Sequence, residues 1–265
     1  MPITLSELNI YPIKSAGGIA MRSAEVTDRG LRLDRRWMLV DSSGRFITQR
    51  EFPRMALLGV GAAEERLTVD APGMATLEIS SSAWPVSPKS VTVWNDVVDA
   101  VPVGDVADKW FSQFLETPCQ LVFMPDHARR AVDDGFALHG EIVSFADAFP
   151  LLLISEASLE DLNNRMPLHL PMNRFRPNLV VGGCDAYAED TWHEIAVGDV
   201  GFRVVKPCAR CAITTVDQRT GIRGEEPLRT LASYRKRDGK VLFGQNLIHA
   251  ATGVLQTGGE VRILA

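Results

Sequence analysis

The chain has 265 residues and a mass of 29.1 kDa, with 46% hydrophobic and 23% charged residues and a mean hydropathy of +0.01. This balance is that of a folded globular protein, and it excludes disordered, collagen-like and coiled-coil classes. The 28 Lys and Arg residues are outnumbered by 33 Asp and Glu residues, which gives a net charge of −5. No overall positive field therefore favours binding to nucleic acid or to anionic lipid.

The N-terminal residues, MPITLSEL, lack the basic and apolar regions of a signal peptide. The longest strongly apolar stretch, residues 149–154, is far shorter than the ~20 residues that cross a bilayer. The four cysteines, Cys119, Cys184, Cys208 and Cys211, are too few and too unevenly spaced for a disulfide scaffold. We therefore expect a cytoplasmic protein with free thiols and no membrane segment.

The first hundred residues predict short strands joined by tight turns. Three hairpins are expected, with arms at residues 37–41 and 45–49, 66–69 and 75–79, and 90–94 and 97–101. Turn residues lie between the arms in each case, and in the last hairpin they are Asn95 and Asp96. Short strands at this spacing are typical of a small barrel or sandwich.

Two helices are predicted next along the chain. The first has Asp105 as its N-cap and ends before Pro118. Its apolar positions recur at helical spacing in Val106, Trp110, Phe111 and Phe114. The second helix follows Ser155, and Ser158 and Asp161 have the spacing of a capping box.

A linker near residues 117–120 divides the predicted elements into two domains, residues 1–118 and 119–265. The second half contains predicted strands at 178–183, 195–205 and 260–264 and a helix at 228–235. We therefore expect a mainly β fold with a few helices, of the α+β class, built from two barrel-like domains.

The segment Cys208-Ala209-Arg210-Cys211 is the sharpest local feature, and several chemistries fit it. Structural zinc needs further ligands at close spacing, and the sequence offers only Cys184 and scattered histidines. A redox pair normally opens a helix, whereas the following Ile213-Thr214-Thr215-Val216 is β-branched and predicts a strand. A single thiolate bound to a metal, favoured by the charge of Arg210, and two buried packing cysteines remain open.

Three further segments concentrate cations. Arg174 and Arg176 are spaced by two before an apolar strand, so we expect them to project to the same side and to grip an anion. Lys14 and Ser15 lie in a glycine-rich turn of a kind that cradles phosphate. Arg35, with Arg36 beside it, precedes another strand. Solvated surface charges are the alternative explanation for each segment taken alone.

Six motifs in a fixed order are more specific than any of them singly. They are Tyr11-Pro12-Ile13-Lys14-Ser15, Asp34-Arg35-Arg36-Trp37, Ser155-Glu156-Ala157-Ser158-Leu159, Asn173-Arg174-Phe175-Arg176-Pro177-Asn178, Cys184-Asp185-Ala186-Tyr187-Ala188-Glu189-Asp190, and Cys208-Ala209-Arg210-Cys211 with Thr214-Thr215-Val216-Asp217. Together they resemble, over nearly the whole chain, the MOSC family with its N-terminal β-barrel domain. That group includes the mitochondrial amidoxime-reducing components and their bacterial relatives.

The resemblance implies a molybdenum enzyme in which a pyranopterin holds the metal and Cys211 supplies a further sulfur ligand. Cys208 and Cys184 are then packing residues. The anchors implied for the anionic cofactor are Lys14, Ser15, Arg35, Arg176, Asn178 and Arg210. Asp147 matches a carboxylate near the metal that relays protons, and Arg50 is expected either to line the pocket from the first domain or to be a surface charge.

The implied reaction is the reduction of small N-hydroxylated or N-oxide compounds such as amidoximes, by transfer of the oxygen atom to molybdenum. The Cys-x4-Cys-x2-Cys motif of a plant-type ferredoxin is absent from the sequence. We therefore expect no intrinsic iron–sulfur cluster, flavin or pyridoxal phosphate, and electrons supplied by a separate flavin or iron–sulfur protein. A monomer without nucleic-acid or membrane partners is expected.

Two other functions use the same residues. In the cofactor sulfurases, a domain of the same family forms the C-terminal part. The chain is therefore alternatively a sulfur carrier, although it has no pyridoxal-phosphate domain to mobilise sulfur. It is also alternatively a protein that binds or stores the molybdenum cofactor without turnover, because Lys14, Arg35 and Arg176 bind phosphate whether or not chemistry follows.

Overall fold

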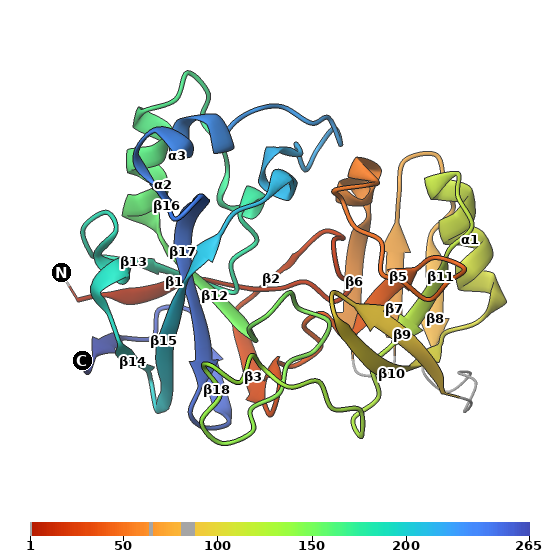
Figure 1. Cartoon of the computed structure of the whole chain (residues 1–265), viewed down its shortest axis with the longest axis horizontal. Helices are drawn as coiled ribbons and strands as arrows, with labels where there is room; N and C mark the ends of the chain where they lie inside the picture. Colours follow the sequence, from red (N-terminus) through yellow and green to blue (C-terminus); the bar gives the residue numbers. More distant parts are fainter. Residues whose placement is uncertain (1, 64–65, 81–87) are drawn as a thin grey trace.

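A computed structural model describes residues 2–63, 66–80 and 88–265 (Figure 1). The molecule has two lobes, seen side by side in Figure 1: a larger lobe on the left around a long sheet, and a smaller lobe on the right. The expected mainly β fold with a few helices is confirmed. The α-helices are α1 (Asp105–Leu115), α2 (Glu156–Asn164) and α3 (Leu228–Tyr234).

The larger lobe is built on a nine-stranded sheet with the order β19-β14-β15-β17-β12-β13-β1-β2, in which β16 pairs with β17. Of the strand pairs in this sheet, β12 and β13 are parallel. The strands are β1 (Thr4–Ile10), β2 (Ile19–Met21), β12 (Leu151–Ser155), β13 (Leu179–Gly182), β14 (Glu194–Val197), β15 (Val200–Ala209), β16 (Lys236–Arg237), β17 (Lys240–His249) and β19 (Val261–Ile263).

Strands from the start of the chain complete this lobe. β1 pairs with β13, and β3 (Ser23–Thr27) pairs with both β4 (Gly30–Leu31) and β18 (Gly253–Gln256). Leu5 and Leu8 of β1 are buried in the same core as residues of the second half. The expected domain boundary between residues 118 and 119 stays a prediction. Strands β1 and β2, which precede this boundary in the chain, belong to the sheet that is built mainly from strands of the second half.

The smaller lobe contains two sheets with the orders β5-β11-β10-β9 and β6-β7-β8. Helix α1 packs here because its apolar face, including Phe111 and Phe114, is buried in the core of this lobe. The strands are β5 (Trp37–Val40), β6 (Gly59–Ala63), β7 (Arg66–Asp70), β8 (Leu77–Ser80), β9 (Lys89–Val93), β10 (Asp96–Pro102) and β11 (Gln120–Phe123).

Two predicted hairpins are confirmed, β7 with β8 and β9 with β10. In the second, Val93 faces Asp96, so the turn is Trp94-Asn95 and lies one residue earlier than predicted. The hairpin predicted at residues 37–49 forms in part. Its arms meet, because the amides of Asp41 and Ile47 donate to the carbonyls of Arg45 and Leu39 and Val40 bridges Phe46. The second arm is not a regular strand, and the first arm, β5, also pairs with β11.

The predicted helix caps are corrected by the structure. Gly104, not Asp105, is the N-cap of α1; its φ of 128° favours glycine where the chain turns from β10 into the helix. Ser155 is the N-cap of α2, and its hydroxyl accepts a hydrogen bond from the amide of Ser158. The hydroxyl of Ser158 is instead bonded to buried Glu189.

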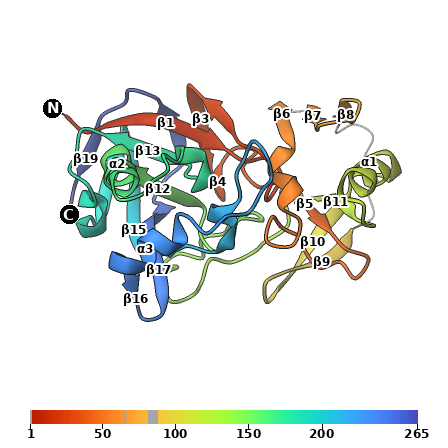
Figure 2. The same ribbon diagram turned by 90° about the horizontal axis from the view of Figure 1, so that it is seen from above.

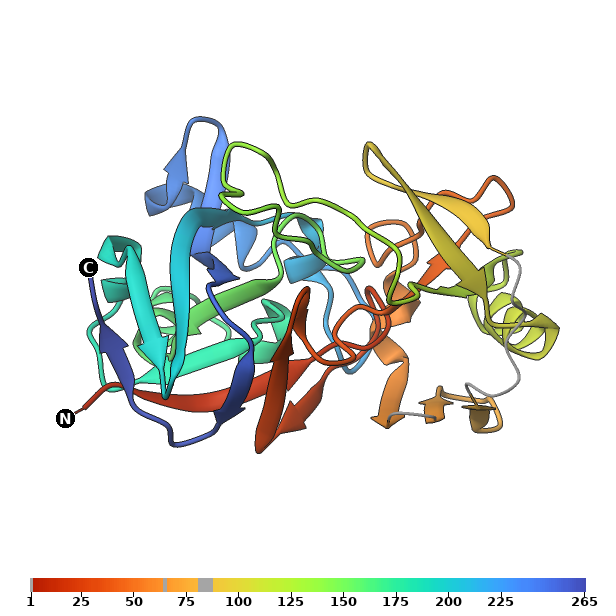
Figure 3. The same ribbon diagram turned by 90° about the horizontal axis from the view of Figure 1, so that it is seen from below.

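The strand predicted at residues 195–205 is two antiparallel strands, β14 and β15, because Gly198 has a φ of 57° at the turn between them. The two lobes are joined by the segment between β11 and β12, drawn in green in Figure 3. Within the residues that the structure describes, no helix is long and apolar enough to cross a membrane.

Candidate functional site

Two adjoining pockets lie where the lobes meet. The inner pocket is lined by all eight of the predicted site residues, which are Lys14, Ser15, Arg35, Asp147, Arg176, Asn178, Arg210 and Cys211. The outer pocket has a volume of about 620 Å³ and is lined by Arg50 and Trp94, among others. Asp147 and Cys211 border both pockets, so they stand at the boundary between them.

Lys14 reaches the inner pocket from the turn after β1. Its side chain is buried, and its Nζ donates to the carbonyl of Phe145 at 2.7 Å and to Asp147 Oδ1 at 2.5 Å. Burial lowers the pKa of Lys14 to about 8, although the charge of Asp147 opposes this shift. An ammonium has three N–H donors, so one remains for a ligand.

The glycines of this turn serve packing rather than a phosphate cradle. A Cβ on Gly18 would lie 2.5 Å from Cε1 of Tyr11, and a Cβ on Gly17 would lie 2.7 Å from the carbonyl oxygen of Leu58. The amide of Gly17 already donates to Leu58. The expected glycine-rich anion site is therefore limited to Lys14 and Ser15.

Tyr11 organises two of the predicted anchors. The guanidinium carbons of Arg35 and Arg176 lie 4.4 and 4.3 Å from the centroid of its ring. Its hydroxyl donates to the carbonyl of Pro177 at 3.0 Å, and burial raises the pKa of Tyr11 to about 12. Tyr11 is thus a neutral aromatic support for two cations.

The backbone at three of the anchors has a conformation that is uncommon for residues other than glycine. Ser15, Arg35 and Arg176 have φ values of 67°, 48° and 59°. Such conformations carry a local energetic cost and persist where the surrounding structure fixes them, often at functional sites. The chain therefore holds these side chains toward the pocket with its backbone as well as with hydrogen bonds.

Asn178 positions Arg35 and is itself fully buried. Its Oδ1 accepts hydrogen bonds from Arg35 Nη1 at 2.9 Å and from the amide of Leu152 at 3.3 Å, while its Nδ2 donates to the carbonyl of Asn9. Arg35 also pairs with buried Asp34 at 2.6 Å. The positive charge of Arg35 is therefore balanced within the protein.

Arg176 and Arg210 differ from Arg35, because neither forms an ion pair with any residue that the structure describes. Arg176 Nη1 donates to the carbonyl of Ala16 at 2.6 Å, and burial lowers the pKa of this guanidinium to about 10. Arg210 donates to the carbonyl of Phe175 at 2.6 Å and to the sulfur of Cys208 at 3.0 Å. Its buried Nε has no partner in the described structure. These two cations leave the inner pocket with positive charge for an anion.

Cys211 follows β15 as the residue before a short 3-10 helix, η5 (Ala212–Thr215). The strand predicted at residues 213–216 is therefore wrong, because the hydroxyls of Thr214 and Thr215 bond back to carbonyls three residues earlier. Arg50 Nη1 lies 3.5 Å from the sulfur of Cys211. Arg50 therefore lines a pocket, as one of its two interpretations predicted, and is not simply a surface charge.

The other cysteines have different surroundings. Cys184 packs against the core of the larger lobe, and Cys208 packs beside Phe175 and also lines the inner pocket. Among residues 2–63, 66–80 and 88–265, no group of three or more His, Cys, Asp or Glu side chains is placed to hold a metal ion. All four cysteines are free thiols.

Asp147 is held at the boundary between the pockets by charge. Burial raises its pKa, but the charge and hydrogen bond of Lys14 outweigh burial and hold this pKa below its ordinary range. Buried Arg130 donates to the carbonyls of Ser144, Ala146 and Asp147 and so fixes the loop that carries the carboxylate. Asp147 is therefore an ionised hydrogen-bond acceptor at neutral pH.

Arg174 does not join Arg176 in the pocket, so the prediction that both project to one side is wrong. It ends a 3-10 helix, η3 (Met172–Arg174), rather than lying in a strand. Its buried guanidinium donates to the carbonyl of Thr214 at 3.0 Å. Arg36 likewise points elsewhere and pairs with Asp126 at 2.7 Å.

Sequence reasoning gave no site role to Tyr11, Trp94 or Arg130. Tyr11 carries a signal, because it stands in the same motif as Lys14. Trp94 carries none, because the pattern placed it at the end of a strand arm, where an aromatic residue is common. Arg130 has no local signal, because its three carbonyl partners are known only from the tertiary structure.

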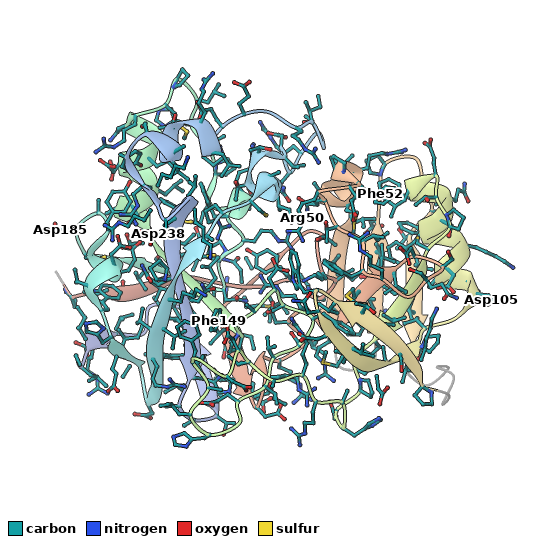
Figure 4. All side chains as sticks on the ribbon, viewed as in Figure 1. Arg50, Phe52, Asp105, Phe149, Asp185 and Asp238 are labelled. Carbon is teal, nitrogen blue, oxygen red and sulfur yellow. The ribbon has the colours of Figure 1, made fainter. Side chains whose placement is uncertain are left out.

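A loop of the larger lobe reaches across to the smaller lobe beside the pockets. Arg223 donates to the carbonyls of Gln49 and Arg50, and Gly221 lies against Arg54. Figure 2 shows this segment in blue next to the orange chain of the smaller lobe. Figure 4 labels Arg50 where the two lobes face each other. The outer pocket itself is lined from both lobes, by Trp94 of the smaller one and Ala209 of the larger one.

Comparisons with known proteins identify the family of both parts of the chain. The model of the MOSC N-terminal beta barrel domain matches residues 2–118, and that of the MOSC domain matches residues 140–262. Mitochondrial amidoxime-reducing component 1 of Mus musculus is 36% identical over 285 residues, covering 98% of this chain and 82% of the relative. Mitochondrial amidoxime reducing component 2 of Bos taurus is 39% identical over 245 residues, covering 89% and 73%.

The solved YUAD protein from Bacillus subtilis has a TM-score of 0.44 at 13% identity, covering 98% of this chain and 94% of that chain. This structural similarity is too low to carry an argument. The identities with the two mammalian proteins, over most of their length, establish homology, and the family prediction is confirmed. The chain therefore belongs to the MOSC family, with a MOSC N-terminal beta barrel domain followed by a MOSC domain.

Proposed function

We propose that this protein is a molybdenum-cofactor-dependent reductase of N-hydroxylated compounds. The single observation that carries the proposal is the inner pocket, in which Arg176 and Arg210 lack carboxylate partners among the described residues and adjoin the thiol of Cys211. The amidoxime-reducing components, the relatives named above, support the type of substrate.

The residues of the inner pocket fit an anionic cofactor with a thiophilic metal. The partnerless Nε of Arg210 is a buried donor that a ligand would satisfy. Lys14 and Arg176 supply further donors for phosphate, and Cys211 supplies the soft sulfur ligand that such a metal prefers. Ser15 lines the same pocket. Arg35 positions Arg176 by donating a hydrogen bond to its carbonyl, and Asn178 in turn holds Arg35 by accepting a hydrogen bond from it.

When bound, the cofactor supplies the two-electron redox chemistry. The reaction breaks the N–O bond of the substrate and consumes two electrons and two protons, which gives the N–H product and water. Asp147 lies at the boundary with the outer pocket, and its Oδ1 accepts a hydrogen bond from Lys14 of the inner pocket. Because Lys14 has a pKa of about 8 and Asp147 is ionised, we assign proton donation to Lys14 and proton relay to Asp147.

The electrons come, in this proposal, from a separate flavin or iron–sulfur protein, and the substrate is a small molecule that enters through the outer pocket. Isolated cofactor-loaded enzyme with a reduced viologen as donor should therefore reduce benzamidoxime to benzamidine. Asp147→Asn should retain the cofactor and lose most of this activity. As a matched control, Asp185→Asn changes an acidic residue of the distant segment before η4 (Ala188–Thr191) and should keep it.

The alternatives give different results in the same experiment. A protein that only stores the cofactor, or only carries sulfur, would hold the cofactor tightly and reduce no N-hydroxy or N-oxide compound. That result with fully loaded wild-type protein would overturn the proposed function.

A further inference from the structure

The outer pocket has a wall that the cofactor site does not use. It comes from the turn between β9 and β10 and from the segment around Arg50, both in the smaller lobe, and it faces Cys211 and Asp147. Given the proposed function, on which this inference rests, substrate must approach Cys211 through this pocket. The wall is therefore where substrate selection is expected.

Trp94 is placed in this wall at a cost to the backbone. It is the first residue of a two-residue hairpin turn and has a φ of 57°, a conformation in which Gly, Asn and Asp are favoured. Its side chain remains 44% exposed. A bulky aromatic residue in such a position gains little from burial, so its contacts at the pocket explain its presence better than folding does.

Those contacts connect Trp94 to the residues nearest Cys211. Its ring packs on Phe46 at a centroid distance of 5.1 Å, and the guanidinium carbon of Arg50 lies 4.5 Å from the centroid of the Trp94 rings. Its Nε1 donates to Asp147 Oδ1 at 3.3 Å. Trp94 therefore positions a cation and a carboxylate together.

Arg50 and Asp147 each have hydrogen-bonding capacity left for a ligand. The guanidinium of Arg50 has five N–H donors, and its hydrogen bond within the described residues is the one to Cys211. Asp147 accepts from both Lys14 and Trp94 on Oδ1. Its Oδ2 accepts no hydrogen bond from the described part of the chain, and its side chain is 57% exposed. A donor and an acceptor thus stand side by side next to an aromatic face.

We propose that Arg50, Asp147 and Trp94 select N-hydroxyamidines and N-hydroxyguanidines over tertiary amine N-oxides. The favoured substrates are planar and carry an oxygen, which accepts from Arg50, and an N–H on the same amidine group, which donates to Asp147. A tertiary N-oxide has the oxygen but no N–H, so it makes one hydrogen bond fewer, the one to the carboxylate of Asp147. Trp94 is a positioning residue that holds the other two.

The kinetic test uses the cofactor-loaded enzyme, a reduced viologen and two aromatic substrates, benzamidoxime and N,N-dimethylaniline N-oxide. We expect wild type to prefer benzamidoxime in kcat/KM by roughly a hundredfold, the scale of one hydrogen bond to a charged group. Trp94→Ala and Arg50→Ala should reduce this preference by about tenfold or more, Trp94→Ala mainly through KM. Trp94→Phe, which retains the stacking surface, should recover part of it.

Arg54→Ala is the matched control, since Arg54 lies near Arg50 in the chain but pairs with Glu116 on the surface. It should retain the full preference. A second arm needs no cofactor: the indole N–H resonance of Trp94, assigned with Trp94→Phe, is followed by NMR in cofactor-free protein. Benzamidoxime should shift this resonance saturably in wild type and more weakly in Arg50→Ala.

The two arms separate failure of this inference from failure of the proposed function. If the loaded enzyme reduces neither substrate, the proposed function is wrong, and the NMR arm still decides recognition. An unchanged substrate preference in Trp94→Ala and Arg50→Ala, or an indole resonance that ignores benzamidoxime, would overturn the role of this wall.

Discussion

The inner and outer pockets share Asp147 and Cys211 but are built in different ways. In the inner pocket, Arg35 and Arg176 stack on buried Tyr11 and donate to backbone carbonyls or to a buried carboxylate. In the outer pocket, Arg50 is held by one exposed aromatic ring and by one long contact to sulfur. The inner guanidinium groups are held by backbone carbonyls and buried side chains, whereas the guanidinium of Arg50 is held by two partly exposed side chains.

This difference matches two kinds of ligand. A site whose cations are oriented in advance binds a permanent anionic group with little further ordering. A site held by stacking adapts to substrates that enter and leave. Residues of the inner pocket should therefore affect stability and cofactor retention, whereas residues of the outer pocket should affect turnover and selectivity.

The sharpest way to break this comparison is to remove the support of the inner pocket. Asn178→Ala deletes three hydrogen bonds of a buried side chain, to Arg35, Leu152 and Asn9. We expect the free energy of unfolding to fall by about 3 kcal/mol, since each buried partner left unpaired costs about 1 kcal/mol or more. Urea denaturation of cofactor-free protein measures this loss, with exposed Asn164→Ala as the control. A loss no larger than that of the control would show that Asn178 supports nothing.

A smaller effect is expected from the pH dependence of stability. Lys14 has a folded pKa of about 8 against an ordinary value of 10.5, so above pH 8 the unfolded chain binds more protons at this residue. The contribution of Lys14 to stability therefore rises with pH through this window, by about 1.5 kcal/mol from pH 8 to pH 9.5.

Lys14→Met should abolish that rise in cofactor-free protein. Tyr11 acts in the opposite direction, but only above pH 10, because its folded pKa is raised from 10.0 to about 12. Denaturation curves at pH 8 and pH 9.5 are thus free of it. Equal slopes in wild type and Lys14→Met would mean that Lys14 is not buried as a charge near the pocket.

The smallest effect is predicted for a substitution in the outer pocket when cofactor retention, a property of the inner pocket, is measured. Arg50→Ala should retain the cofactor as well as wild type does after gel filtration. Within the described residues, its guanidinium has no hydrogen bond to the inner cations, and its contact to the sulfur of Cys211 is long, at 3.5 Å. Arg176→Ala, measured in parallel, should lose it, with an affinity roughly tenfold to a hundredfold lower from the deleted charged hydrogen bonds. Cofactor loss from both variants would erase the distinction between the pockets.

The sequence predicted the local elements of the fold better than their partners. The hairpins β7–β8 and β9–β10 follow from alternating patterns and turn residues close together in the chain. The pairing of β1 with β13 joins segments far apart in the chain, and no local pattern specifies such a contact. Likewise, the pattern around residue 37 predicted a strand correctly, but not the pairing of this strand with β11, which lies far along the chain.

For the site, the six motifs and the family resemblance that they carry were enough to predict eight residues that line the inner pocket. They were not enough to distinguish residues that can donate hydrogen bonds to a ligand from residues that only position those donors. Asn178 and Arg35 have the polar groups of ligand-binding residues, yet their hydrogen bonds are used within the protein. Arg174 has the same charge as Arg176 but opposite placement, because a 3-10 helix replaces the expected strand. Such distinctions depend on backbone geometry that spacing alone does not give.

The most direct test of the central claim is the molybdenum and pterin content of the purified protein. Wild type and Cys211→Ser are expressed in a host that overproduces the cofactor, and the metal is measured by elemental mass spectrometry and the oxidised pterin by fluorescence. We predict an equimolar amount of molybdenum in wild type, with the metal lost or inactive in Cys211→Ser. Wild-type protein that contains neither metal nor pterin, despite the cofactor-rich host, would contradict the assignment of the inner pocket.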